Sequence, residues 1–266
     1  MGVAGAAIAT AISQMVSTLV YLTYVLRKRS AFSFSVKAFS PTGQMMAEIL
    51  KIGIATLVFQ LLTSLSITLI NRAASDYGDS VIAGMGAVTR ITSMGTLVVF
   101  GFLKGFQPIA GFSYGAKKFN RLREVIKTSI IWSTSFCLVV GLVMAVFSTQ
   151  IISQFTEGDT QMISAGQKSL FANGITFILF GFYTVYSSLF LALGKGAAGF
   201  FLGACRQGVC FVPVILLLPM VWGMNGILYA QPIADVISVV ITVFMALHLH
   251  RELSMAEKQV MSNSEI

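Results

Sequence analysis

Charged residues are scarce in this sequence. Asp, Glu, Lys and Arg together make up 11% of its 266 residues, whereas apolar residues make up 56%. A soluble globular protein carries about 25% charged residues, so this chain has too few charges to cover a surface that faces water. The shortage excludes an ordinary soluble enzyme and a disordered segment, and it predicts an all-α polytopic membrane protein.

Cysteine and histidine are also rare, with three Cys and two His in the chain. Cys137, Cys205 and Cys210 lie inside apolar runs, which favours small packing residues over disulfides or a metal site. His248 and His250 are two residues apart, a spacing that does not place both on one helical face for a metal ion. The sequence has no Walker A motif and no Ser-His-Asp or Cys-His arrangement. We therefore expect neither enzymatic activity nor a metal site.

Seven long apolar runs are present, and each covers the roughly 20 residues that a helix needs to cross a bilayer. Barrel strands alternate over about ten residues, whereas these runs are longer and apolar on all sides, so they predict helices. The predicted spans are Met1–Leu26, Lys51–Ile70, Val81–Tyr114, Thr128–Phe155, Ser169–Leu193, Ala197–Pro219 and Trp222–Leu249.

The net charge of +8 comes from basic residues that gather in alternate loops between these runs. The basic loops contain Arg27, Lys28, Arg29 and Lys37, then Lys117, Lys118, Arg121, Arg123 and Lys127, then Lys195, and finally Arg251 and Lys258 in the tail. The intervening loops are acidic or uncharged. The positive-inside rule places the basic loops and the C-terminus in the cytoplasm, with the spans in the plasma (cytoplasmic) membrane. Since membrane orientation accounts for the basic residues, we expect no nucleic-acid partner.

Three segments carry a resemblance to a known family. They are the opening GVAGAAIATAISQ, the stretch GFLKGFQPIAGFSYGAKKFNRLREV from Gly101 to Val125, and RQGVCFVPVILLLPMVWGMNGILYAQPIADVIS from Arg206 to Ser238. In this order they resemble the sixth, the eighth, and the eleventh and twelfth transmembrane segments of the multidrug and toxic compound extrusion (MATE) family. The resemblance implies a twelve-helix exporter of two six-helix lobes, of which this chain holds the end of segment six and the second lobe.

The resemblance implies four parts. Residues 1–26 end the first lobe, residues 27–46 form a cytoplasmic linker, residues 47–250 form the second lobe, and residues 251–266 form a cytoplasmic tail. The implied partners are the lipid bilayer, the N-terminal lobe of the same transporter, and cationic amphipathic drugs. The family exports such drugs in exchange for Na⁺ or H⁺ by alternating access, so the coupling ion is the only cofactor expected.

The sequence departs from the family pattern at the coupling residues. Some members carry acidic residues in the seventh and tenth segments, but Ile52–Ile70 and Ser169–Leu193 contain no acid. In other members the coupling aspartate lies in the first lobe. Neither the coupling ion nor its binding residue follows from this chain. In addition, Ala55 stands where a proline often follows in the seventh segment, which puts a kink there in doubt.

Arg206 and Asp235 are expected to form a buried charge pair. The turn near Val221 lies almost midway between them in the sequence. At a helical rise of about 1.5 Å per residue, both sit about 21–23 Å from the turn. The pair is interpreted either as a structural clamp between adjacent helices or as a group that handles protons or substrate.

Arg90 and Lys104 are further cations inside a predicted span. Arg90 has no acidic neighbour at its expected depth in the preceding span, so we hypothesise that it faces the cleft between the lobes and pairs with a first-lobe carboxylate. The alternative is a structural bond to Gln60 or Thr63. Lys104 is interpreted as a residue that extends towards the lipid headgroups.

Gln107 and Pro108 are expected to interrupt the third span. Proline removes a backbone hydrogen bond, and the glycines near it, including Gly105, allow close helix contact. Gly105 and Pro108 are therefore candidate hinge residues, and a static packing kink is the alternative.

Polar and aromatic side chains recur at helical spacing in the fifth span. Asn173, Tyr183 and Tyr186, together with Gln60, Arg90 and Gln107 elsewhere, are the candidate substrate-contacting residues. An aromatic stripe can receive a flat cation by stacking and cation–π contact. Plain packing of membrane helices is the alternative.

Secondary active drug efflux is thus the leading interpretation. A lipid-linked oligosaccharide flippase of the same superfamily and a non-transporting truncated membrane fragment remain as alternatives.

Overall fold

The computed structural model describes residues 2–27, 42–156 and 158–264. The chain divides into two units, Met1–Ile52 and Gly53–Ile266. The first unit contains α1 (Gly2–Leu26) and the beginning of α2 (Gly43–Ser75), which continues into the second unit. The side chains along α1 are largely exposed, with Met15 at 65% and Tyr21 at 73%. Apolar side chains in this state are typical of a helix that contacts lipid or other protein.

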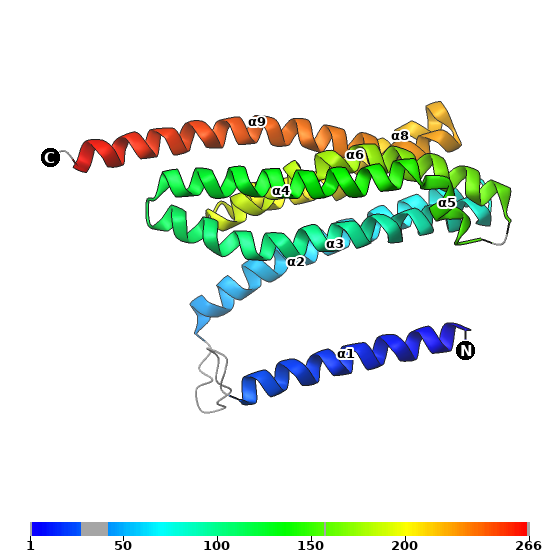
Figure 1. The fold of residues 1–266 in the computed structure, drawn as a ribbon, viewed down its shortest axis with the longest axis horizontal. Helices are drawn as coiled ribbons and strands as arrows, with labels where there is room; N and C mark the ends of the chain where they lie inside the picture. Colours follow the sequence, from blue (N-terminus) through cyan, green and yellow to red (C-terminus); the bar gives the residue numbers. More distant parts are fainter. Residues whose placement is uncertain (1, 28–41, 157, 265–266) are drawn as a thin grey trace. The chain divides into compact units, whose positions relative to one another are not determined.

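The second unit is entirely helical over its described residues. Its further elements are α3 (Asp79–Gly115), α4 (Phe119–Val146), α5 (Ser148–Ser153), α6 (Thr160–Ala192), α7 (Gly196–Ala204), the π-helical turn η2 (Cys205–Val209), α8 (Phe211–Trp222) and α9 (Met224–Ser264). The long helices α3, α4, α6 and α9 run alongside one another (Figure 1). Seven segments of the described chain are long and apolar enough to cross a membrane, which confirms the predicted fold class.

Several helices extend beyond their predicted limits. α4 begins at Phe119 rather than Thr128, because the basic run folds as its first turns, and it ends at Val146 before the short α5. α6 begins at Thr160, nine residues before the predicted start. Asp159 caps it, since its Oδ1 accepts hydrogen bonds from the backbone of Gln161 and Met162 at 2.9 and 3.0 Å. The hydroxyl of Ser80 and this capping contact hold the pKa of Asp159 below its usual range.

The C-terminal segment is a continuation of α9 and not a separate or frayed tail. α9 extends without a break from Met224 to Ser264. Leu253 is buried, and Glu257 forms a 2.7 Å ion pair with Arg123 on α4. The expected boundary at residues 250–251 therefore falls inside one helix. The expected linker lies mostly outside the described residues, and its last part, from Gly43, already belongs to α2.

α6 forms the centre of the second unit. It packs against α3, α4 and α9, and its contact with α4 depends on glycine. A Cβ atom at Gly181 would lie 2.8 Å from the backbone of Ser133, and one at Gly174 would lie 2.7 Å from the carbonyl oxygen of Gly141. Small residues of this kind let membrane helices approach closely enough for backbone contact.

We expect Gly181→Val to destabilise the protein. The added side chain would meet the backbone of α4, which cannot move aside as a flexible side chain would, and overpacking typically costs about 1–3 kcal/mol. Thermal unfolding of the detergent-solubilised protein should show a melting temperature lowered by several degrees. Gly86→Val is the matched control, because a Cβ atom at Gly86 meets nothing within 4 Å. Equal melting temperatures would contradict the close contact.

Candidate functional site

An ion pair between Arg206 on η2 and Asp235 on α9 forms the polar centre of the second unit. Nε of Arg206 lies 2.9 Å from Oδ1 of Asp235, and Nη2 donates a 3.2 Å hydrogen bond to Oδ2. The amide of Gln231 donates a 2.8 Å hydrogen bond to the same Oδ1. The Arg206 and Asp235 side chains are only 12% and 7% exposed. The contact expected from their common depth is thus present, while its role stays a prediction.

One aromatic side chain of α6 contacts this pair directly. The Arg206 guanidinium carbon lies 4.7 Å from the centre of the Phe180 ring, within the range of a cation–π contact. Phe180 in turn stacks on Phe177, with ring centres 5.3 Å apart. The hydroxyl of Tyr183 donates a 2.8 Å hydrogen bond to the carbonyl of Leu202. The aromatic stripe therefore holds a cation of the protein itself.

The π-helical turn η2 positions Arg206, and Pro213 follows four residues after the end of this turn. Pro213 has no N–H to offer the carbonyl of Val209 four residues earlier, so the α-helical bonding pattern cannot continue there. The backbone N–H of Cys210 instead bonds the carbonyl of Cys205 at 2.9 Å. π-turns inside helices are frequent at functional sites.

α2 contacts the same turn from the other side. The hydroxyl of Ser66 donates a hydrogen bond to the carbonyl of Gln207. A Cβ atom at Gly208 would lie 2.9 Å from the Leu62 side chain. The carbonyl of Gln207 in the irregular turn thus finds a partner inside the protein, as freed backbone groups must at membrane depth.

Two of the expected substrate contacts on α6 are engaged within the lobe. The Asn173 side chain is buried and donates hydrogen bonds to the carbonyl and hydroxyl oxygens of Ser169 at 2.9 and 3.3 Å. Tyr186 lies towards the opposite end of α6, where its hydroxyl is 2.8 Å from Nε2 of His250. Like Tyr183, both are buried. Whether either contacts a substrate remains a prediction.

α3 presents two cations on its exposed side. Arg90 and Lys104 are separated by close to four whole helical turns, so they share one face. Within the described part of the chain, neither forms a hydrogen bond or an ion pair. The structure contains no bond from Arg90 to Gln60 or Thr63 within the described lobe. The hydroxyl of Thr63 instead donates to the carbonyl of Phe59 at 3.0 Å.

Pro108 does not interrupt α3, contrary to the sequence prediction. The helix continues from Asp79 to Gly115 with Pro108 inside it. A Cβ atom at Gly105 would meet nothing within 4 Å, so this glycine does not mediate a close contact in the described lobe. Gln107 is half-buried between these positions. A hinge at Gly105 and Pro108 stays a prediction.

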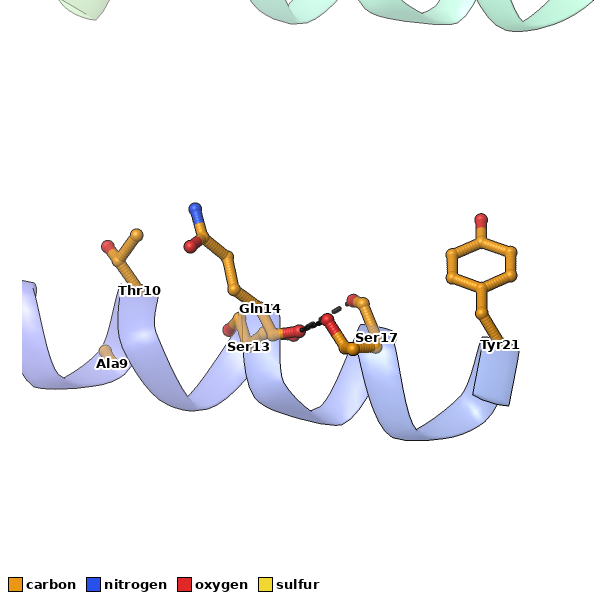
Figure 2. A pocket seen from close by; sticks show the side chains of 7 residues that line it. Ala9, Thr10, Ser13, Gln14, Ser17 and Tyr21 are labelled. Atoms are coloured by element: carbon orange, nitrogen blue, oxygen red, sulfur yellow. Dashed lines mark hydrogen bonds between the residues drawn. The ribbon is translucent and has the colours of Figure 1, made fainter. Parts of the chain in front are cut away.

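α1 carries a polar face of its own in the first unit. Thr10, Gln14, Ser17 and Tyr21 recur at helical spacing on one side of the helix (Figure 2). An open cavity of about 640 Å³ lies against this face, and the Ser17 hydroxyl donates a 2.9 Å hydrogen bond to the carbonyl of Ser13. Because polar groups are costly to bury in hydrocarbon, the face indicates contact with protein or water.

The family model MatE matches residues 54–217. The chain belongs to the MatE family. This match covers more than half of the chain and includes α3, α4 and α6. The expected membership in the MATE family is thereby confirmed.

Relatives and solved structures agree with this membership. The multidrug export protein MepA of Staphylococcus haemolyticus (strain JCSC1435) is 28% identical over 96% of this chain and 56% of its own length. MepA of Staphylococcus saprophyticus is 27% identical over 89% of this chain and 52% of its own length. The chain thus spans about half the length of the curated relatives that it matches.

The fold matches MATE crystal structures. A MATE in complex with MaL6 superposes with a TM-score of 0.81 at 21% identity, covering 97% of this chain and 58% of the other. An outward-facing multidrug resistance MATE transporter gives 0.81 at 22% identity with the same coverage. A transporter from Pyrococcus furiosus Vc1, described by the reverse polarity of its binding pocket, gives 0.80 at 21% identity, covering 97% and 57%.

The sequence did not reveal four features of this MATE lobe. Gln231 and Phe180 were not associated with the ion pair, and the π-helical turn was not expected. Pro213, in the middle of an apolar run, was the available signal for the turn. Lys168 is a further exposed cation, within α6, that was missed because the predicted span began one residue later.

Proposed function

We propose that this chain is the second lobe of a secondary active exporter in the plasma membrane. The exporter carries cationic amphipathic compounds out of the cell in exchange for Na⁺ or H⁺. The observation that carries the proposal is the MatE match over residues 54–217, combined with the coverage of about half of each MepA relative. The partner is then the N-terminal lobe of the same transporter, and the C-terminus of α9 faces the cytoplasm.

Charge distribution supports a cleft between two lobes. Asp235 is the only buried charged residue of the described chain, and it is already paired with Arg206. Arg90, in contrast, is exposed and unpaired within the described lobe. An arginine at membrane depth faces a bundle interior or a water-filled cavity, so the exposed face of α3 fits the wall of the cleft, with Arg90 opposite a first-lobe carboxylate.

Collapse of single ion gradients should identify the coupling ion. We expect cells that express the complete transporter to accumulate less of a fluorescent cation than cells without it. Removal of one of the two gradients, Na⁺ or pH, should abolish this difference and removal of the other should not, because antiport draws its energy from one of them. Accumulation is followed by cell fluorescence with each gradient dissipated separately. Efflux that survives the collapse of both gradients would contradict antiport.

Export of a lipid-linked oligosaccharide is the second candidate function. The observation that favours it is Arg90, a cation that is exposed and unpaired within the described lobe, since a pyrophosphate group requires a cationic site. A complete transporter that moves a labelled lipid pyrophosphate and leaves the fluorescent cation behind would favour this function.

A further inference from the structure

A groove of about 590 Å³ runs along the α3–α4 hairpin, apart from the ion-pair site. Phe106 and Ser129 are buried and form its floor. Phe102, Ile109 and Trp132 line it with exposed rings and an exposed aliphatic side chain. The open glycine at position 105 leaves room along the α3 side. The groove is therefore an apolar channel on the outside of the described lobe.

One end of the groove is cationic. Arg121 and Glu124 lie at the end closest to the α3–α4 turn, and Lys117 and Lys118 precede them in that turn. Within the described residues, Arg121 forms no hydrogen bond or ion pair, whereas its neighbour Arg123 is bound to Glu257 at 2.7 Å. Arg121 and Glu124 are the charged residues that line the groove, and Lys117 and Lys118 add positive charge beside this end. Arg121 is available to a ligand.

The dimensions fit one leaflet of a membrane. Arg121 and Trp132 are eleven residues apart on α4, which corresponds to about 17 Å. The hydrocarbon of one leaflet is about half of a 30 Å core. A molecule with an anionic head at Arg121 and a chain reaching Trp132 would thus span the groove from end to end.

We propose that this groove binds an anionic phospholipid, with its phosphate at Arg121 and an acyl chain along Phe102, Phe106 and Trp132. Basic pockets between membrane helices bind anionic headgroups in this way, and the positive end of the groove selects such lipids over zwitterionic ones. A transported cation is disfavoured there because three basic side chains outnumber Glu124. The proposal does not depend on which substrate the transporter exports.

Tryptophan fluorescence can test the site directly. The chain contains two tryptophans, so Trp222→Phe leaves Trp132 as the single reporter. The detergent-solubilised chain is titrated with phosphatidylglycerol or phosphatidylcholine that carry the same brominated acyl chains, which quench tryptophan on contact. We expect phosphatidylglycerol to quench Trp132 at the lower mole fraction. Arg121→Gln should raise that mole fraction about fivefold, to the level of phosphatidylcholine.

Lys117→Gln is the matched control, because it removes one positive charge near the same end of the groove but does not line the groove. It should leave the preference for phosphatidylglycerol largely intact. Equal quenching by the two lipids, or equal effects of the two substitutions, would overturn the proposal and indicate diffuse attraction to the surface. Release of the quenching by tetraphenylphosphonium but not by unbrominated phosphatidylglycerol would also overturn it, since the groove would then belong to a cationic substrate.

Discussion

Asp235→Leu is expected to destabilise the protein by about 3–5 kcal/mol, because it leaves the Arg206 guanidinium buried without its countercharge. The two side chains are 12% and 7% exposed, so water can compensate the lost partner only slightly. Gln231 would lose an acceptor in the same step. The expected observation is a large fall in melting temperature, or loss of the monodisperse protein, after solubilisation.

A double substitution separates structure from function at this pair. Asp235→Leu combined with Arg206→Met removes both charges, and replacement of a buried ion pair by apolar residues is often neutral or stabilising. We expect the double variant to recover most of the lost stability, so that the coupling energy from the double-mutant cycle is at least as large as the stability recovered. A double variant as unstable as Asp235→Leu alone would contradict the clamp.

Transport by the double variant then decides the role of the pair. Restored stability together with restored transport would identify a clamp that holds η2 against α9. Restored stability without transport would show that the charges take part in the transport cycle. Asp235→Asn is the conservative comparison, because it keeps an oxygen that can accept hydrogen bonds from Arg206 and Gln231 but removes the charge.

The depth of Arg206 and Asp235 in the hairpin of η2, α8 and α9 could be derived from the sequence. The direction in which the side chains point could not. Arg206 and Asp235 were placed together by counting residues from one turn, an argument that tolerates a small error in the position of that turn. Phe180 and Tyr183 lie on α6, which is apolar on nearly all sides. A helix of this kind has no polar face that would show which side points to its neighbours, so the contact of Phe180 with Arg206 and that of Tyr183 with α7 emerged only from packing.

Helix limits were misjudged wherever polar residues continued a helix. The first turns of α4 contain the basic run, and the first turns of α6 contain Lys168 and the cap at Asp159. A span predicted from hydrophobicity ends where polar residues begin. The helical hydrogen bonds of the backbone nevertheless continue through these residues. At α3 the error was the reverse: Pro108 was expected to interrupt the helix, but a single missing N–H is tolerated within its 37 residues.

Arg90→Gln is expected to reduce export by about tenfold or more while leaving the fold intact. Arg90 makes no hydrogen bond or ion pair within the described lobe, so its loss should not change the melting temperature. If it lies opposite a first-lobe carboxylate or a substrate group, removal of the charge should cost about 1.4 kcal/mol or more, which corresponds to a factor of ten. Efflux by the complete transporter, normalised to the amount of protein in the membrane, measures this effect.

Lys104→Gln provides a closely matched control. Arg90 lies eleven residues after the first residue of α3, and Lys104 lies eleven residues before the last. Both are exposed and share one face, so the two substitutions remove equal charge at equivalent distances from the helix ends. We expect Lys104→Gln to export normally, because its flexible side chain can extend to the headgroups. Full export by Arg90→Gln would contradict a role for Arg90 in the cleft.

Assays with two kinds of substrate can show whether Arg90 pairs with a first-lobe carboxylate or with an anionic group of the substrate. The same variants are assayed with a permanently cationic dye and with a zwitterionic compound that carries a carboxylate. Loss of both activities indicates that Arg90 pairs with a carboxylate of the first lobe, because the pair then serves the movement of the lobes whatever the cargo. Loss confined to the zwitterion indicates that Arg90 binds the anionic group of the substrate itself, since a cationic dye offers it no partner.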